Sequence, residues 1–158
     1  MKSLGLTKVL ITGSNGFIGK NLALRMKEEG KYEILTFARG DSDQHLSNML
    51  LNADLVVHLA GENRPESPDL FALVNTGLTL KISQILTSNG IRVPIIFVSS
   101  AQATKSNAYG QSKLEAENVL KKLSENNGNP VSTFRLPGVF GKWCRPEYNS
   151  VVATFCHN

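Results

Sequence analysis

Short apolar runs rich in β-branched residues alternate along this chain with longer segments in which apolar positions recur at helical spacing. The short runs predict five strands, at 8–12, 32–38, 55–59, 95–98 and 131–136. The longer segments predict helices at about 16–28, 70–89 and 109–126, and a loosely helical polar stretch at 41–52. Strands separated by helices indicate βαβ units. We therefore predict an α/β fold with a doubly wound parallel sheet, right-handed crossovers and strand order 3-2-1-4-5.

Composition and charge limit the functional classes. The chain has 158 residues, of which 41% are hydrophobic and 19% charged, as in a single globular domain. The net charge of +4 comes from scattered Lys and Arg side chains, which suits a small anionic ligand and argues against nucleic acid. No apolar run is long enough to cross a bilayer and the N-terminus lacks a signal-peptide pattern, so we expect a cytoplasmic protein without a membrane partner. Cys144 and Cys156 lack metal-site spacing, and we expect reduced thiols and no metal.

The segment between the first strand and the first helix is rich in glycine. It reads Thr12-Gly13-Ser14-Asn15-Gly16-Phe17-Ile18-Gly19. Gly13 permits a sharp turn, Gly16 lets a pyrophosphate approach the main chain, and Gly19 lets the helix pack closely on the strand. The helix N-terminus adds free N–H groups and the positive end of its dipole. We therefore predict a Rossmann domain in which residues 13–19 bind the phosphates of a dinucleotide.

The residue that follows the second strand distinguishes the two nicotinamide cofactors. A carboxylate there would accept a hydrogen bond from the ribose 2′-OH and repel a 2′-phosphate. The chain has Arg39 instead, whose guanidinium can pair with a phosphate, whereas Asp41 and Asp43 come slightly late. We therefore expect NADP(H) to be preferred, with NAD(H) as the alternative cofactor.

Polar side chains follow the fourth predicted strand, at the sheet edge where ligands of parallel sheets collect. Ser99 and Ser100 end that strand. Tyr109 and Lys113 begin the next helix four residues apart, so they share one face. We expect Lys113 to lower the pKa of Tyr109 and to hold the nicotinamide ribose, while Tyr109 exchanges a proton with a substrate oxygen that Ser100 also contacts. The predicted catalytic residues are therefore Tyr109, Lys113 and Ser100, acting with hydride transfer.

Together these motifs resemble the extended short-chain dehydrogenase/reductase superfamily, in particular its NAD-dependent epimerase/dehydratase branch, which acts on nucleotide sugars. The likeness rests on the glycine loop, on His58-Leu59-Ala60-Gly61, on Ser99-Ser100 and on Tyr109-x-x-x-Lys113. It extends to the strand end 135–141, where Gly138 replaces the family's asparagine. It implies further cofactor contacts by Leu59, Ala60, Gly61, Asn75, Ser99, Tyr109, Lys113 and Pro137. It also implies that a homodimer can form through the helices at 70–89 and 109–126.

A narrower likeness joins segments 60–66, 102–104 and 140–156 to CapF-type capsular-polysaccharide enzymes. This resemblance implies an N-terminal reductase domain that reduces the C4 ketone of a UDP-4-keto-6-deoxy-amino-sugar with NADPH, towards UDP-N-acetyl-L-fucosamine. It implies substrate contacts by Arg64, Ser100, Gln102, Lys142, Trp143, Arg145 and Asn149. Residues 1–158 would then form an incomplete Rossmann domain, truncated within the substrate region and lacking the C-terminal cupin of those enzymes.

Other interpretations stay open on the sequence. One is an epimerase or dehydratase with bound, recycled NAD. Another is a non-catalytic NADP(H)-binding module, which truncation favours and the intact Tyr109–Lys113 pair argues against. Trp143 is either a core residue or a stacking platform for uracil. His58 lies inside an apolar strand and is expected to be structural.

Overall fold

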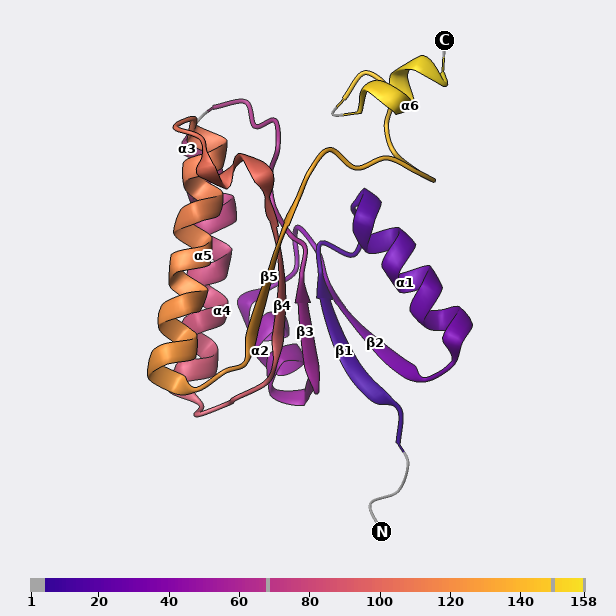
Figure 1. Ribbon diagram of the computed structural model, residues 1–158. Coiled ribbons are helices and arrows are strands. Elements are labelled where there is room, and N and C mark those ends of the chain that lie inside the picture. The colour runs from indigo at the N-terminus through magenta and orange to yellow at the C-terminus, as the bar shows by residue number, and fades with distance from the viewer. Residues whose placement is uncertain (1–4, 68, 149, 158) are drawn as a thin grey trace.

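The computed structural model describes residues 5–67, 69–148 and 150–157 and contains a parallel sheet with helices on both faces (Figure 1). Its strands are β1 (Thr7–Thr12), β2 (Tyr32–Phe37), β3 (Leu55–His58), β4 (Ile95–Ser100) and β5 (Val131–Leu136). Every pairing between them is parallel. The predicted doubly wound α/β fold is therefore confirmed, and all five predicted strands form.

The order of the strands differs from the prediction. It is β2-β1-β3-β4-β5, not 3-2-1-4-5, because β3 pairs with β1 from Val9 opposite Leu55 to Thr12 opposite His58. In this order β3 is almost wholly buried in a central position, whereas β2 is partly exposed at an edge. The segments that follow β2 and β3 consequently lie on either side of the end of β1.

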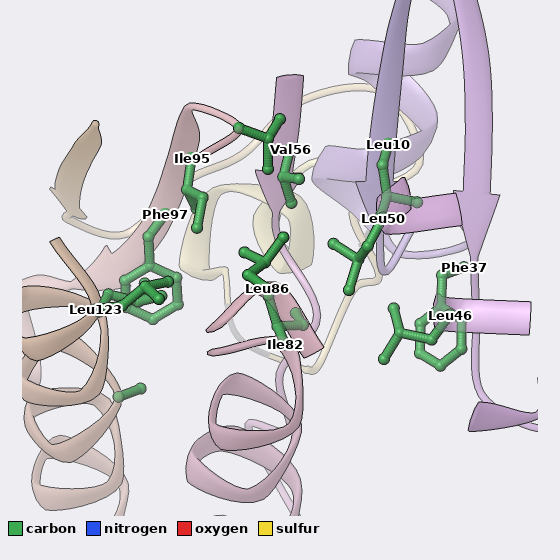
Figure 2. Packing of buried hydrophobic residues seen from close by; sticks show 13 residues of the cluster. Leu10, Phe37, Leu46, Leu50, Val56, Ile82, Leu86, Ile95, Phe97 and Leu123 are labelled. Carbon is green, nitrogen blue, oxygen red and sulfur yellow. The ribbon is translucent and has the colours of Figure 1, made fainter. Parts of the chain in front are cut away.

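The helices cover the two faces unequally (Figure 1). One face carries α1 (Phe17–Glu29), and the other carries α2 (Asp43–Asn52), α4 (Gly77–Ser88) and α5 (Ala108–Asn127). Figure 2 shows the larger core, where side chains of the sheet meet Ile82 and Leu86 of α4. Burying each large apolar side chain contributes about 1.5–3 kcal/mol, so this core makes the sheet a firm support for the residues at its edge.

Local sequence signals set the helix ends. The Oγ of Ser42 accepts a hydrogen bond from the main-chain N–H of His45 at the start of α2, and the Oδ1 of Asn107 accepts one from that of Gly110 at the start of α5. Gly30 ends α1 in the left-handed conformation, with φ of 65°. These ends lie close to the predicted ones.

The predicted helix at 70–89 forms, but part of it is a π-helix. It consists of α3 (Asp69–Phe71), a π-helix η1 (Ala72–Thr76) and then α4. The wide turn of η1 brings the side chain of Asn75 into the interior, where it is 2% exposed. Single π-helical turns are frequent at functional sites, and η1 lies next to α5 and the loop after β3.

After β5 the chain runs across the carboxyl end of the sheet to the short helix α6 (Val151–Phe155), drawn in yellow in Figure 1. The carbonyl of Lys142 accepts a hydrogen bond from the Asn21 side chain of α1 at 2.8 Å. On the other side, the Arg64 guanidinium donates to the carbonyl of Glu147 at 3.4 Å. The segment 139–148 is thus attached on both sides of the sheet edge.

Candidate active site

A cleft of about 1160 Å³ lies at the carboxyl ends of the strands. Its walls come from the segments after β1, β2, β3, β4 and β5, from the start of α5, and from the segment 139–148. Among its lining residues are Gly13, Asn15, Gly16, Phe17, Ile18, Gly19, Arg39, Leu59, Gly61, Arg64, Ser99, Ser100, Gln102, Tyr109, Lys113, Pro137, Trp143 and Arg145. Residues from distant parts of the sequence thus meet at one edge of the sheet.

The glycine loop fits tightly between β1, β3 and α1. A Cβ atom on Gly13, whose φ is 71°, would lie 2.8 Å from the main chain of Ala60, and one on Gly19 would lie 2.7 Å from the Cα of Ser14. Gly16 caps α1 without a side-chain hydrogen bond, and the first residues of the helix line the cleft. We call this loop the glycine cradle; main-chain N–H groups with little side-chain bulk around them are what a pyrophosphate site requires.

Three of the residues predicted to contact a cofactor do not line the cleft. Ser14 is buried, Ala60 lies behind the glycine loop, and the amide of Asn75 is occupied by other protein groups. Among the predicted substrate residues, Lys142 does not line the cleft, and Asn149 lies outside the described residues.

Arg39 makes an ion pair that the sequence did not reveal. Its Nη2 lies 2.6 Å from an Oε of Glu62; the Arg39 side chain is 81% exposed and that of Glu62 is 17% exposed. Burial would raise the pKa of Glu62, but hydrogen bonds from Arg39 and from the N–H groups of Arg64 and Asn63 outweigh it and lower the pKa. Glu62 is therefore a fixed negative charge at neutral pH.

Tyr109 and Ser100 lie together on the wall of the cleft. The Tyr109 ring is half-buried and packs against Phe71 of α3, with 5.6 Å between ring centroids. Burial raises the pKa of Tyr109, and a hydrogen bond with Ser100 opposes this shift without cancelling it. The phenol therefore holds its proton at neutral pH.

The Lys113 ammonium is held by the main chain of β4. Only 5% of the residue is exposed, its Nζ donates to the main-chain oxygen of Val98 at 3.1 Å, and the same atom lies 5.0 Å from the centre of the Phe97 ring. Burial lowers the pKa of Lys113 to about 8, against the opposite effect of Glu117. The expectation that Lys113 lowers the pKa of Tyr109 is wrong for this structure, because burial of the phenol dominates.

A polar cluster behind Lys113 was also missed. Glu117, one helical turn further along α5, accepts hydrogen bonds from both the Nε and the Nη2 of Arg135 and from the Oγ of Ser99. It ties α5 to β4 and β5 at the point where Lys113 enters the cleft. Its spacing of four residues from Lys113 was the available signal, but only the fold brings Arg135 to it.

His58 is a structural residue, as expected. It is buried between two hydroxyls, with the Oγ1 of Thr12 2.7 Å from its Nδ1 and the Oγ1 of Thr79 3.0 Å from its Nε2. Thr79 donates its proton to the carbonyl of Asn75, so it accepts from the Nε2–H of His58, and the Nδ1 accepts from Thr12. Burial and the nearby Lys113 lower the pKa of His58 to about 3, which keeps the ring neutral.

Trp143 belongs to the surface of the cleft and not to the core. The residue is 44% exposed, has a φ of 67°, and carries the Lys142 ammonium 4.5 Å from its ring centre. Nearby, the ring of Tyr148 lies 5.2 Å from the guanidinium of Arg64 and 6.0 Å from that of Arg145. The outer wall of the cleft is formed by Arg64, Trp143, Arg145 and Tyr148.

Two sequence expectations concern absences. Within the described residues, no three His, Cys, Asp or Glu side chains come together in a way that could hold a metal ion, and the expectation of a metal-free protein stays a prediction. Over the same residues, no helix is long and apolar enough to cross a membrane.

Comparison with known proteins identifies the family. The model of the NAD dependent epimerase/dehydratase family matches residues 9–158, which include the glycine loop, Ser100, Tyr109 and Lys113. The chain belongs to this family. Membership agrees with a cleft that combines a dinucleotide cradle with a tyrosine and a lysine.

Within the NAD-dependent epimerase/dehydratase family, the chain is 49% identical over 151 residues to the UDP-2-acetamido-2,6-beta-L-arabino-hexul-4-ose reductase of Pseudomonas aeruginosa, covering 96% of this chain and 41% of the relative. The structure of the capsular polysaccharide assembling protein CapF from Staphylococcus aureus superposes with a TM-score of 0.81 at 44% identity, over 94% of this chain and 40% of that protein. The chain thus spans about two fifths of the length of both proteins.

A more distant structure shares the fold alone. RMD from Pseudomonas aeruginosa, solved with NADPH, superposes with a TM-score of 0.79 at 22% identity, over 90% of this chain and 57% of that protein.

Proposed function

We propose that this chain forms the cofactor-binding and catalytic part of a cytoplasmic reductase that uses NADPH to reduce the C4 ketone of a UDP-4-keto-6-deoxy-amino-sugar for surface polysaccharide synthesis. The observation that carries the proposal is the presence of Ser100, Tyr109 and Lys113 on the wall of the cleft that also contains the glycine cradle. The 49% identity to a reductase of a UDP-linked 4-keto sugar supports the choice of substrate.

In the proposed reaction, NADPH supplies the hydride that adds to C4. Tyr109 donates its proton to the C4 oxygen, which takes up the electron pair of the carbonyl π bond, so that a hydroxyl forms. Ser100 donates a hydrogen bond to the same oxygen. The raised pKa of Tyr109 keeps the proton on the phenol before the step. We assign to Lys113 its other predicted role, holding the nicotinamide ribose.

The charges of the cleft suit two anionic ligands. Its described lining includes Lys20, Arg39, Arg64, Lys105, Lys113 and Arg145, and Glu62 is the single carboxylate among those described lining residues. We assign the inner, glycine-lined end to the dinucleotide. We assign the outer wall to the sugar nucleotide; this wall contains Arg64, Gln102, Trp143 and Arg145. The exposed Trp143 ring would stack on the uracil.

A second candidate is epimerase or dehydratase chemistry with bound NAD. The observation that favours it is the Glu62 carboxylate beside Arg39, since a negative charge there disfavours a 2′-phosphate. This candidate predicts tighter binding of NADH than of NADPH and no net consumption of either during turnover.

The test combines binding with turnover. We expect the protein to bind NADPH in a fluorescence titration and to consume it when a UDP-4-keto-amino-sugar is added. Tyr109→Phe should bind NADPH as the wild type does and lose about 100-fold or more in turnover, whereas Tyr32→Phe, at the sheet edge, should keep full activity. Unchanged turnover in Tyr109→Phe would contradict the catalytic assignment.

A further inference from the structure

Glu62 is the one carboxylate that the described residues contribute to the cleft, and the other charged residues among them are all cationic. One Oε accepts from the Nη2 of Arg39 at 2.6 Å, and the other accepts from the N–H groups of Asn63 and Arg64 at 3.1 and 3.3 Å. Both carboxylate oxygens are therefore engaged. The negative charge has a fixed position rather than moving with a free side chain.

The main chain of Glu62 is fixed as well. Its N–H donates to the Oδ1 of Asn75 at 2.7 Å, and its carbonyl accepts from the Nδ2 of Asn75 at 3.2 Å. The same Nδ2 also donates to the Oγ of Ser112 on α5 at 3.0 Å. Asn75 sits in the π-helix η1 and is itself held through Thr79 and His58, so the main chain that carries the Glu62 side chain has a fixed position at the cleft.

The strand order gives this ion pair its place. Arg39 follows β2 and Glu62 follows β3, and β1 lies between those strands. The Arg39–Glu62 pair therefore spans the end of β1, next to the glycine loop that begins at Gly13. A dinucleotide in the glycine cradle places its adenosine ribose towards the end of β2, within reach of this pair.

We propose that Glu62 is a specificity-determining residue which, by holding Arg39 and opposing a second anion at its guanidinium, reduces the preference for a 2′-phosphorylated dinucleotide. The inference rests on the proposed dinucleotide site. A 2′-phosphate on Arg39 shares one guanidinium with the Glu62 carboxylate, so the two anions lie within a Debye length, which is about 8 Å at physiological ionic strength. Repulsion between the two anions weakens the binding of NADP(H). The binding of NAD(H), which carries a hydroxyl at the 2′ position, is almost unaffected.

The decisive variant is Glu62→Gln, which removes the charge and keeps a side-chain oxygen that can accept from the N–H groups of Asn63 and Arg64. Dissociation constants of NADPH and NADH are measured by fluorescence titration at low salt and at about 0.5 M salt. We expect the ratio of the NADH to the NADPH constant to rise about fivefold in Glu62→Gln at low salt, through tighter NADPH binding, and the gain to shrink at high salt. Arg39→Ala should lower the ratio below that of the wild type.

The matched control is Glu66→Gln, which removes an exposed carboxylate from the same loop and should leave the ratio unchanged. Glu62→Ala serves as a second variant if the glutamine variant does not fold. A ratio that stays constant or falls in the Glu62 variants overturns the inference while leaving the proposed function intact. Failure of the wild type to bind either dinucleotide overturns both.

Discussion

The Nζ of Lys113 donates a hydrogen bond to the main-chain oxygen of Val98 at 3.1 Å, which fixes the ammonium against β4 at the wall of the cleft. A Cβ added to Gly61 would lie 3.2 Å from that Nζ, so the loop after β3 covers the ammonium closely. The lysine is thus part of the support of the cleft as well as of its lining. Burial lowers the pKa of Lys113.

Burial of Lys113 predicts a particular dependence of stability on pH. The pKa of Lys113 is about 8 in the folded protein and 10.5 for a lysine in the unfolded chain, so between these values the unfolded chain binds more protons. The free energy of unfolding should therefore rise with pH across this interval, by about 1.4 kcal/mol per pH unit at most. Denaturant unfolding of the wild type and of Lys113→Met across this range measures the difference, and equal slopes for the two would contradict the prediction.

His58 predicts a second dependence at acidic pH. Its pKa is about 3 in the folded protein and 6.5 for a histidine in the unfolded chain, so the unfolded chain binds more protons between these values. Stability should fall as the pH decreases through this interval, and His58→Gln should lose this part of the pH dependence. His45→Gln, which changes a half-exposed histidine on α2, is the control and should keep the wild-type curve.

Glu117→Gln should destabilise the protein by about 1–3 kcal/mol, because Arg135 and Ser99 lose a charged acceptor that is 13% exposed. It should also lower the pKa of Lys113 further, since Glu117 favours the ammonium form. Urea unfolding gives the first effect and the pH at which the Lys113 amine becomes reactive to acylation gives the second. Glu125→Gln, from an exposed pair with Lys121 on the same helix, should change stability by less than about 0.5 kcal/mol.

Gly110→Ala should cost about 1–3 kcal/mol, because α5 packs directly on the 3-10 helix η2 (Ala101–Thr104). The added Cβ would lie 2.7 Å from the carbonyl oxygen of Lys105 and closer still to that of Gln102. The matched control is Gly77→Ala at the start of α4, where the nearest atom would be 3.9 Å away. That variant should be neutral or slightly stabilising, and thermal unfolding of both proteins compares them.

Most of the fold could be predicted from the sequence, because the patterns that indicate strands, helices and turns are local. The alternation of β-branched runs and helical segments placed all five strands, and Gly30 marked the end of α1. The spacing of Gly13, Gly16 and Gly19 indicated the cradle, since those glycines serve a turn and a close approach within a single βαβ unit. The positions of Ser100, Tyr109 and Lys113 relative to the strand and helix ends indicated that they share one cleft.

The pattern could not give the strand order, because a buried apolar strand such as β3 fits on either side of its neighbours, and only its pairing with β1 decides. It also could not show the π-helix that contains Asn75, because apolar spacing and capping residues mark where a helix begins and ends, not which main-chain hydrogen bonds form within it. The contacts of Glu62 with Arg39 and of Glu117 with Arg135 depend on that order and on packing.

By itself, then, the sequence determined that this chain folds around a parallel sheet with a glycine-rich loop and a tyrosine–lysine pair at its edge. The tertiary structure decided which charges face one another across that edge, and whether Lys113 reaches the phenol or the main chain of Val98. The physical reason is that hydrophobic period and turn chemistry are properties of neighbouring residues. Burial and ion pairing are instead properties of groups that only the completed fold brings together.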